Sequence, residues 1–188
     1  MSKIALIVAA GLATSASAAT FGPGSGGAMA DNDPVGTSFT LNVASSGTIV
    51  SMDSLDIDIN HTWVGDLIIT LEHDGTTVSI MDRPGVPAST FGNGDDLAGI
   101  YSFADGGAAF PEATGSGSVA PGTYAAAGSL ADFVGQDING TWTLHISDNA
   151  AGDTGAVAEW FINATVPAPG AAALFGLGGL AAARRRRA

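Results

Sequence analysis

Segments in which apolar and polar residues alternate recur along the middle of this 188-residue chain. Leu55, Ile57 and Ile59 alternate with polar residues, which places three apolar side chains on one face of an extended strand. Three further segments show the same period, with their apolar positions at Leu67, Ile69 and Leu71, at Trp142, Leu144 and Ile146, and at Trp160, Ile162 and Ala164. Because each strand would bury only one face, we expect an all-β fold of two packed sheets.

Turn residues separate these segments and set the expected boundaries. Asp74-Gly75 predicts a tight hairpin turn between two strands. Residues 22–36 and 85–128 are rich in Gly, Ala, Ser and Pro, and they predict loops. We therefore expect a flexible entry at 19–36 and a single β-sandwich domain at 37–165.

The first 18 residues have the order of a secretory signal peptide. A charged start at Lys3 precedes the apolar run Ile4 to Leu12, and Ala16-Ser17-Ala18 supplies a small-x-small cleavage pattern. The chain is therefore predicted to be exported, with its mature form beginning at or near Ala19.

Residues 166–188 have three parts: a proline motif, an apolar segment and a basic end. The residues that define the pattern are Val166, Pro167, Pro169, Arg184, Arg185, Arg186 and Arg187. The apolar segment is shorter than the roughly 20 residues of a permanent membrane span. This order resembles the PEP-CTERM sorting tail of exopolysaccharide-producing Gram-negative bacteria, although the usual Pro-Glu-Pro is Pro-Ala-Pro here.

The resemblance implies a transient inner-membrane tether that an exosortase-type sorting enzyme cleaves during export to the cell surface. The alternative, a frayed Ala/Gly tail with a basic end, remains open.

Charge changes the picture of possible partners. All 18 acidic residues lie between Asp31 and Glu159, and Arg83 is the one basic residue in that stretch. A nucleic-acid-binding surface needs clustered Lys and Arg, so the composition excludes nucleic acid as a partner. The absence of cysteine excludes disulfides, thiol nucleophiles and cysteine-based metal sites.

Two blocks of sequence carry a more specific resemblance. The first runs over residues 55–67 and continues through 75–78 and 82–85, and the second runs over 140–155 and ends at Trp160. Together they resemble the P domain, or P/Homo B domain, that follows the catalytic domain in kexin- and furin-like subtilisin proteases. The resemblance covers about residues 37–165. It implies a galactose-binding-like β-sandwich of jelly-roll type.

Catalytic residues do not accompany that resemblance. A subtilisin-like protease needs Asp, His and Ser in that chain order. Gly36-Thr37-Ser38 is similar to the Gly-Thr-Ser around a subtilisin nucleophile, but no histidine precedes Ser38. We therefore expect no enzyme activity. His61 lies in the matched motif and is expected to make a structural hydrogen bond to a loop, whereas His73 and His145 are expected to be solvated.

Oxygen ligation of a hard cation is the strongest chemistry that the residues suggest. Asp148, Asn149 and Asp153 lie in a Gly-containing loop, and Asp66 is the best partner from the other block. Calcium takes six to eight such oxygen ligands. A calcium site at Asp66, Asp148 and Asp153 is therefore predicted, and the alternative that these residues only form turns remains open.

Two further residues stand out. Arg83 is expected to pair with Asp82 or Asp66. Trp63, in a loop-like stretch, is an open candidate for stacking on a carbohydrate.

These observations predict an exported, non-catalytic P-domain protein that serves as an adhesion, structural or binding module at the cell surface or in the exopolysaccharide matrix. A second hypothesis is an accessory domain that stabilises or targets a separate subtilisin-like serine endopeptidase. A third is a lectin-like binder that uses Trp63.

Overall fold

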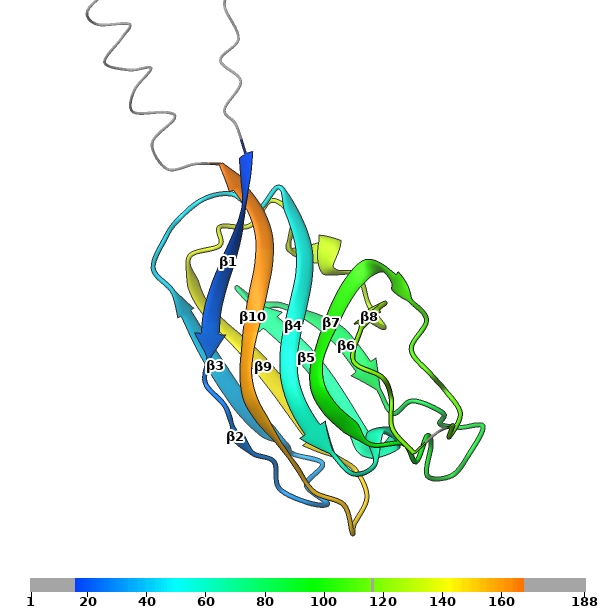
Figure 1. The fold of residues 1–188 in the computed structure, drawn as a ribbon. Coiled ribbons are helices and arrows are strands. Elements are labelled where there is room, and N and C mark those ends of the chain that lie inside the picture. The colour runs from blue at the N-terminus through cyan, green and yellow to red at the C-terminus, as the bar shows by residue number, and fades with distance from the viewer. Residues whose placement is uncertain (1–15, 116, 168–188) are drawn as a thin grey trace, which may run out of the picture.

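Two β-sheets, antiparallel except for the β7–β8 pair, pack face to face in the computed structural model, which describes residues 16–115 and 117–167 (Figure 1). The first sheet has the order β1-β10-β4-β7-β8, with β2 pairing to β10. Its strands are β1 (Ala16–Gly24), β2 (Gly27–Ala28), β4 (Ser51–His61), β7 (Leu97–Ala108), β8 (Thr123–Tyr124) and β10 (Gly155–Pro167). The expected all-β sandwich is confirmed.

The second sheet has the order β3-β9-β5-β6. Its strands are β3 (Thr37–Val43), β5 (Leu67–His73), β6 (Thr76–Asp82) and β9 (Gly140–Asp148), and two short 3₁₀ helices, η1 (Val64–Asp66) and η2 (Leu130–Phe133), lie in the connections.

The chain crosses between the sheets at most connections, which gives the jelly-roll arrangement. The exception among the main strands is the β5–β6 hairpin. Its turn residues Asp74 and Gly75 both have positive φ, 46° and 79°. That backbone geometry suits a two-residue hairpin, as the sequence predicted.

The core lies between the sheets and is built from the predicted alternation. Leu55, Ile57 and Ile59 of β4 are buried, whereas Asp56 and Asp58 between them face outward and are partly exposed. Central strands pair on both sides, with β10 and β7 flanking β4.

The aromatic residues of the core include one unexpected partner. Trp142 and Trp160 are fully buried. His73 was predicted to be solvated, and that prediction is wrong, because its ring stacks on Trp142 with centroids 3.9 Å apart. Its ring nitrogens lie 3.1 Å and 2.7 Å from the carbonyl oxygens of Thr141 and Asp137.

The predicted loop at 85–128 contains a strand. β7 pairs with β4 over seven residue pairs, and Leu97, Tyr101 and Phe103 face the core. Glycine at position 99 interrupts the apolar alternation, which is why the sequence pattern did not indicate a strand there.

The entry segment at 19–36 also holds ordered structure. β1 pairs with β10 from Ala16 to Gly24, and Thr20 Oγ1 donates a hydrogen bond of 2.6 Å to Asn163 Oδ1. At the other terminus Val166 and Pro167, predicted to begin the sorting tail, are the last residues of β10. The rest of that tail and residues 1–15 lie outside the described residues.

The two described ends of the chain meet at one end of the sandwich. Ala16 pairs with Pro167, and β4 begins beside them because Ser51 pairs with Thr165. At the opposite end β4 finishes at His61, which pairs with Gly155. β4 has 11 residues, and the ten steps between its first and last residue, at about 3.3 Å each, separate these ends by roughly 33 Å. We call them the terminus end and the loop end.

The helices of the described residues are the two short 3₁₀ turns, and none of them has the length and apolar character needed to span a membrane.

Candidate functional site

The loop end of the sandwich brings together the residues singled out by the sequence. β4 ends at His61, and the chain then turns through Trp63 and η1 into β5. The 91–95 loop packs on η1, where Gly65 donates a hydrogen bond of 2.8 Å to the Asn93 carbonyl. A Cβ on Gly65 would lie 2.5 Å from the Phe91 carbonyl oxygen, so this close approach requires glycine.

His61 and Asp148 form a buried pair at the base of this region. His61 Nε2 lies 3.1 Å from Asp148 Oδ2, and both side chains are essentially inaccessible. Because a carboxylate accepts, Nε2 is the donor to Asp148, while Nδ1 lies 3.2 Å from the Trp63 backbone nitrogen and 3.0 Å from the Trp63 carbonyl oxygen. The other Asp148 oxygen accepts from the Ala150 N–H at 3.2 Å. The predicted structural role of His61 is confirmed.

Asp66 is buried in the same region without a hydrogen bond at one oxygen. Asp66 is 2% exposed, and its Oδ1 has no hydrogen-bond partner. The nearest cation is Arg83, whose Nη2 lies 3.8 Å from that oxygen. Burial raises the pKa of Asp66 to about 6, with further contributions from the negative charges of Asp148 and Asp153.

Arg83 is held in place by backbone contacts as well as by charge. Its Nε donates to the Gly65 carbonyl at 3.0 Å. Of the two partners expected for Arg83, the structure shows Asp66.

Asp153 approaches from the β9–β10 loop. Its Oδ1 accepts a hydrogen bond of 2.8 Å from Thr62 Oγ1. Asp66, Asp148 and Asp153 therefore lie in one region, as predicted.

These three carboxylates do not form a ready set of metal ligands. Both oxygens of Asp148 already have partners, and one oxygen of Asp153 is bonded to Thr62. Within residues 16–115 and 117–167, no group of three or more acidic or histidine side chains is placed to hold a metal ion. Only the unpartnered oxygen of Asp66 fits a missing cation, so calcium at this site stays a prediction.

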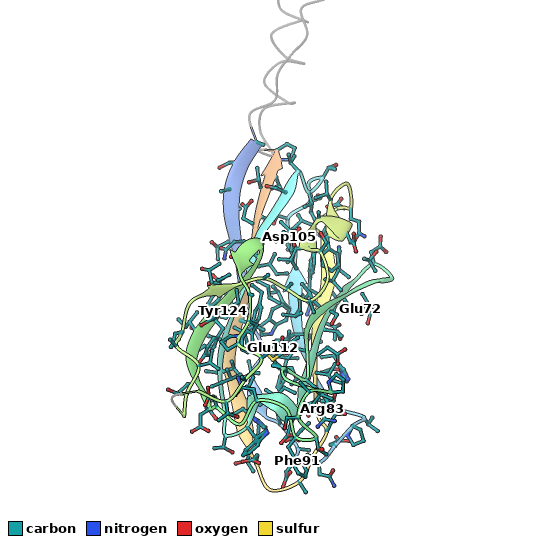
Figure 2. All side chains as sticks on the ribbon, turned by 90° about the vertical axis from the view of Figure 1, so that its right-hand side faces the viewer. Glu72, Arg83, Phe91, Asp105, Glu112 and Tyr124 are labelled. Atoms are coloured by element: carbon teal, nitrogen blue, oxygen red, sulfur yellow. The ribbon has the colours of Figure 1, made fainter. Side chains whose placement is uncertain are left out.

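A pocket of about 400 Å³ opens beside these carboxylates. It is lined by Trp63, Asp66, Phe91, Ala150, Ala151 and Asp153, and we call it the end pocket. Trp63 Nε1 donates a hydrogen bond of 2.6 Å to the Phe91 carbonyl, which ties the two aromatic residues together. Figure 2 shows Phe91 at the loop end, with Arg83 close to that end.

Sequence reasoning found Trp63 and the acidic residues of this pocket but missed Phe91. Phe91 is 61% exposed and lies in a stretch without periodicity, so no apolar pattern indicated it. An isolated large apolar residue between Gly and Thr in a loop was the only available hint.

Ser38, whose sequence context is similar to that of a subtilisin nucleophile, contacts a histidine. Ser38 Oγ lies 3.0 Å from His145 Nδ1, across neighbouring strands β3 and β9. The pair lies on the outer face of the second sheet, and Ser38 is exposed. Ser38 follows Gly36 and Thr37 into β3, so it lacks the strand-to-helix turn of an activated serine nucleophile.

Comparison with known proteins finds sequence similarity to one family model and to two proteases. Residues 112–164 match the sequence model of the proprotein convertase P-domain. The chain is 28% identical over 130 residues to the calcium-dependent protease of Nostoc sp. and to that of Trichormus variabilis. Each alignment covers 67% of this chain and 15% of the relative, so the chain spans a small part of either protease.

Among solved structures, the serine protease of Aeromonas sobria in complex with its chaperone aligns with a TM-score of 0.46 and 16% identity. That alignment covers 81% of this chain and 27% of the protease chain.

Proposed function

We propose that this chain is an exported, non-catalytic P-domain module that is sorted to the cell surface or the exopolysaccharide matrix and serves there in adhesion or as a structural unit. The observation that carries the proposal is the pairing of Ala16 with Pro167, which brings both described ends to one end of the sandwich. A tether attached at that end leaves the loop end, with its pocket, roughly 33 Å away.

This arrangement suits a module held at its terminus end. Signal-peptide cleavage after Ala18 would remove three exposed residues of β1 and leave the pairs from Ala19 onward in place. An exosortase-type enzyme acting on the tail would cut next to the end of β10 and leave the fold intact.

Fractionation of the native host tests the sorting proposal. The wild-type chain is expected in the surface or matrix fraction, with a mature N-terminus at or near Ala19. A variant with Arg184 to Arg187 changed to alanine is expected to stay cell-associated with its tail uncut. Equal distribution of the two chains, or recovery of intact Met1 protein outside the cell, would overturn it.

The second candidate is an accessory module for a separate subtilisin-like serine endopeptidase. It is supported by the P-domain match at 112–164 and by the proteases among the relatives. A pull-down from the native exported fraction tests it. Recovery of a subtilisin-like protease whose thermal half-life shortens when this chain is removed would favour this candidate over the structural one.

Calcium enters the proposal as a stabilising ligand near Asp66. Its support is the unpartnered buried oxygen of that residue, together with the calcium dependence stated in the relatives' names. Its test is the melting experiment argued in the Discussion.

A further inference from the structure

The end pocket combines two kinds of lining side chain. Two of its lining residues, Asp66 and Asp153, are carboxylates, and two, Trp63 and Phe91, are aromatic. Ala150 and Ala151 complete the lining with small side chains. Its volume of about 400 Å³ lies within the range of sites that hold small organic groups, about 300–1,000 Å³.

An independent observation indicates that the pocket lacks a positive partner. Asp66 is buried, and its Oδ1 has no hydrogen bond. A buried carboxylate oxygen without a donor is costly, because it has lost water and gained nothing in return. Arg83 lies 3.8 Å away, beyond hydrogen-bonding distance, and its Nε is committed to the Gly65 carbonyl.

The charge around the pocket is predominantly negative. Asp66, Asp148 and Asp153 lie in this region, against the guanidinium of Arg83 and the imidazole of His61 that pairs with Asp148. The wider sequence strengthens the bias, because the 18 acidic residues between Asp31 and Glu159 are opposed in that stretch by Arg83 alone. Such a field raises the local concentration of cations and repels anions.

The aromatic walls decide which cation fits. A hydrated metal ion gains little from indole and phenyl rings, whereas an alkylammonium or guanidinium group is attracted to an aromatic ring and also buries its alkyl chain against it. A neutral sugar would also stack on these rings, but it would leave the net negative charge around Asp66 uncompensated.

We propose that the end pocket binds the side chain of a lysine or arginine presented by a partner protein. The charged head group donates hydrogen bonds to Asp66 and to the Asp153 oxygen that Thr62 does not use. Its alkyl chain packs between Trp63 and Phe91. Exposed Phe91 then lies against the surrounding surface of the partner. The inference goes beyond the proposed function, because it holds for any basic partner and does not depend on sorting.

Nuclear magnetic resonance of the ¹⁵N-labelled full chain in calcium-free, low-salt buffer tests this inference. The three tryptophans give three indole N–H signals, and the Trp63 signal is assigned with the Trp63→Phe variant. The probes are the peptides acetyl-Gly-Lys-Gly-amide and acetyl-Gly-Arg-Gly-amide. The matched neutral probe carries an acetylated lysine, which keeps the length and removes the charge.

Both charged peptides are expected to shift the Trp63 signal in a saturable way, with the acetylated peptide at least about tenfold weaker. The signals of the buried residues Trp142 and Trp160 report that the fold is intact and should not move.

Matched variants locate the binding. Asp66→Asn and Asp153→Asn are each expected to weaken the charged peptides about fivefold or more, whereas Glu72→Gln, the same charge change at an exposed site on β5, should alter binding less than twofold (Figure 2). Phe91→Ala should weaken binding, and Ile100→Ala, at a similarly exposed apolar position on β7, should not. Asp153→Asn keeps the test valid if Asp66→Asn fails to fold.

Three results would overturn the inference. One is equal binding of the lysine and acetyl-lysine peptides, and another is unchanged binding in both carboxylate variants. The third is a Trp63 response to neutral oligosaccharides with none to the charged peptides, which would make the pocket a saccharide site. None of these readouts depends on where the chain is sorted, so failure here and failure of the proposed function are distinguishable.

Discussion

At the scale of single residues, the loop end contrasts two carboxylates that are equally buried. Asp148 and Asp66 are each 2% exposed. Asp148 accepts hydrogen bonds from His61 and from the Ala150 N–H, whereas Asp66 has an oxygen with no donor. Burial is therefore compensated for Asp148 and uncompensated for Asp66, so the two residues should respond in opposite ways to mutation.

Asp66 is predicted to make folding less favourable as pH rises. Its folded pKa of about 6 lies above the unfolded value of 3.8, so the native state holds the proton more tightly. Protonated Asp66 therefore adds up to about 3 kcal/mol to the free energy of unfolding. This contribution is fully present below about pH 3.8 and is lost as pH rises through about 6. Urea unfolding of Asp66→Asn should show a weaker decline than the wild type over this interval.

The comparison must be between variants, because other carboxylates titrate in the same range. Glu72→Gln, which neutralises an exposed carboxylate, serves as the control and should retain the wild-type pH dependence. A pH profile of Asp66→Asn that parallels the wild type would show that Asp66 is not the group responsible.

The His61–Asp148 pair carries the opposite prediction. His61→Leu removes the donor of a buried carboxylate and the acceptor of the Trp63 N–H, so it should lower the free energy of unfolding by about 2 kcal/mol or more. Ser38→Ala removes an exposed serine–histidine contact and should cost less than about 0.5 kcal/mol. Denaturant unfolding of both variants checks the contrast, and similar losses for the two would contradict the assignment of His61 to the core.

At the scale of elements, periodicity predicted the strands whose alternation is unbroken. β4, β5, β9 and β10 each present a run of branched or aromatic residues to the core, and such runs are visible in sequence. β7 was missed because Gly99 stands where an inward residue would be, so Leu97 and Tyr101 did not fall into one pattern.

β1 was missed for a different reason. Its residues overlap the cleavage region of the predicted signal peptide, and they are small. What holds Ala16–Gly24 as a strand is pairing with β10, a contact about 140 residues away in sequence that local patterns do not record.

Truncation from the N-terminal end of β1 should leave stability nearly unchanged up to Ala19 and lower it clearly beyond that residue. A chain that begins at Ala19 loses only three exposed residues and should keep its melting temperature within about 3 °C. A chain that begins at Ser25 also loses Phe21, which packs on the core, and the ladder that covers the edge of β10. It should lose at least about 2 kcal/mol of stability.

Calorimetry of the two truncated chains checks this boundary. Equal melting temperatures would show that β1 contributes nothing to the sandwich. A large loss for the Ala19 chain would place a necessary part of the fold within the predicted signal peptide.

At the scale of the whole molecule, the sequence identified the acidic side of the candidate site but not its shape. Asp66, Asp148 and Asp153 are brought together because η1 and the β9–β10 loop both lie at the loop end, which follows from strand order alone. The partners that occupy their oxygens, Thr62 and the Ala150 N–H, depend on loop conformations that strand patterns do not specify.

The last prediction concerns the net charge of the stretch from Asp31 to Glu159. Eighteen acidic residues against Arg83 make the native state repel itself, so sodium chloride should raise the melting temperature by screening. A calcium ion bound near Asp66 would add a specific increment, about 2.7 kcal/mol at a hundredfold excess over its dissociation constant. For a domain of this size that is a shift of about 5 °C or more.

The control separates binding from screening. Magnesium at matched ionic strength should raise the melting temperature less than calcium, because calcium tolerates the irregular oxygen sets that loops provide. Asp153→Ala should remove most of the calcium-specific increment and leave the sodium chloride response unchanged. If both divalent ions act equally in the wild type and in Asp153→Ala, then these carboxylates only form turns, and the positive partner that Asp66 lacks must be supplied by something other than a metal ion.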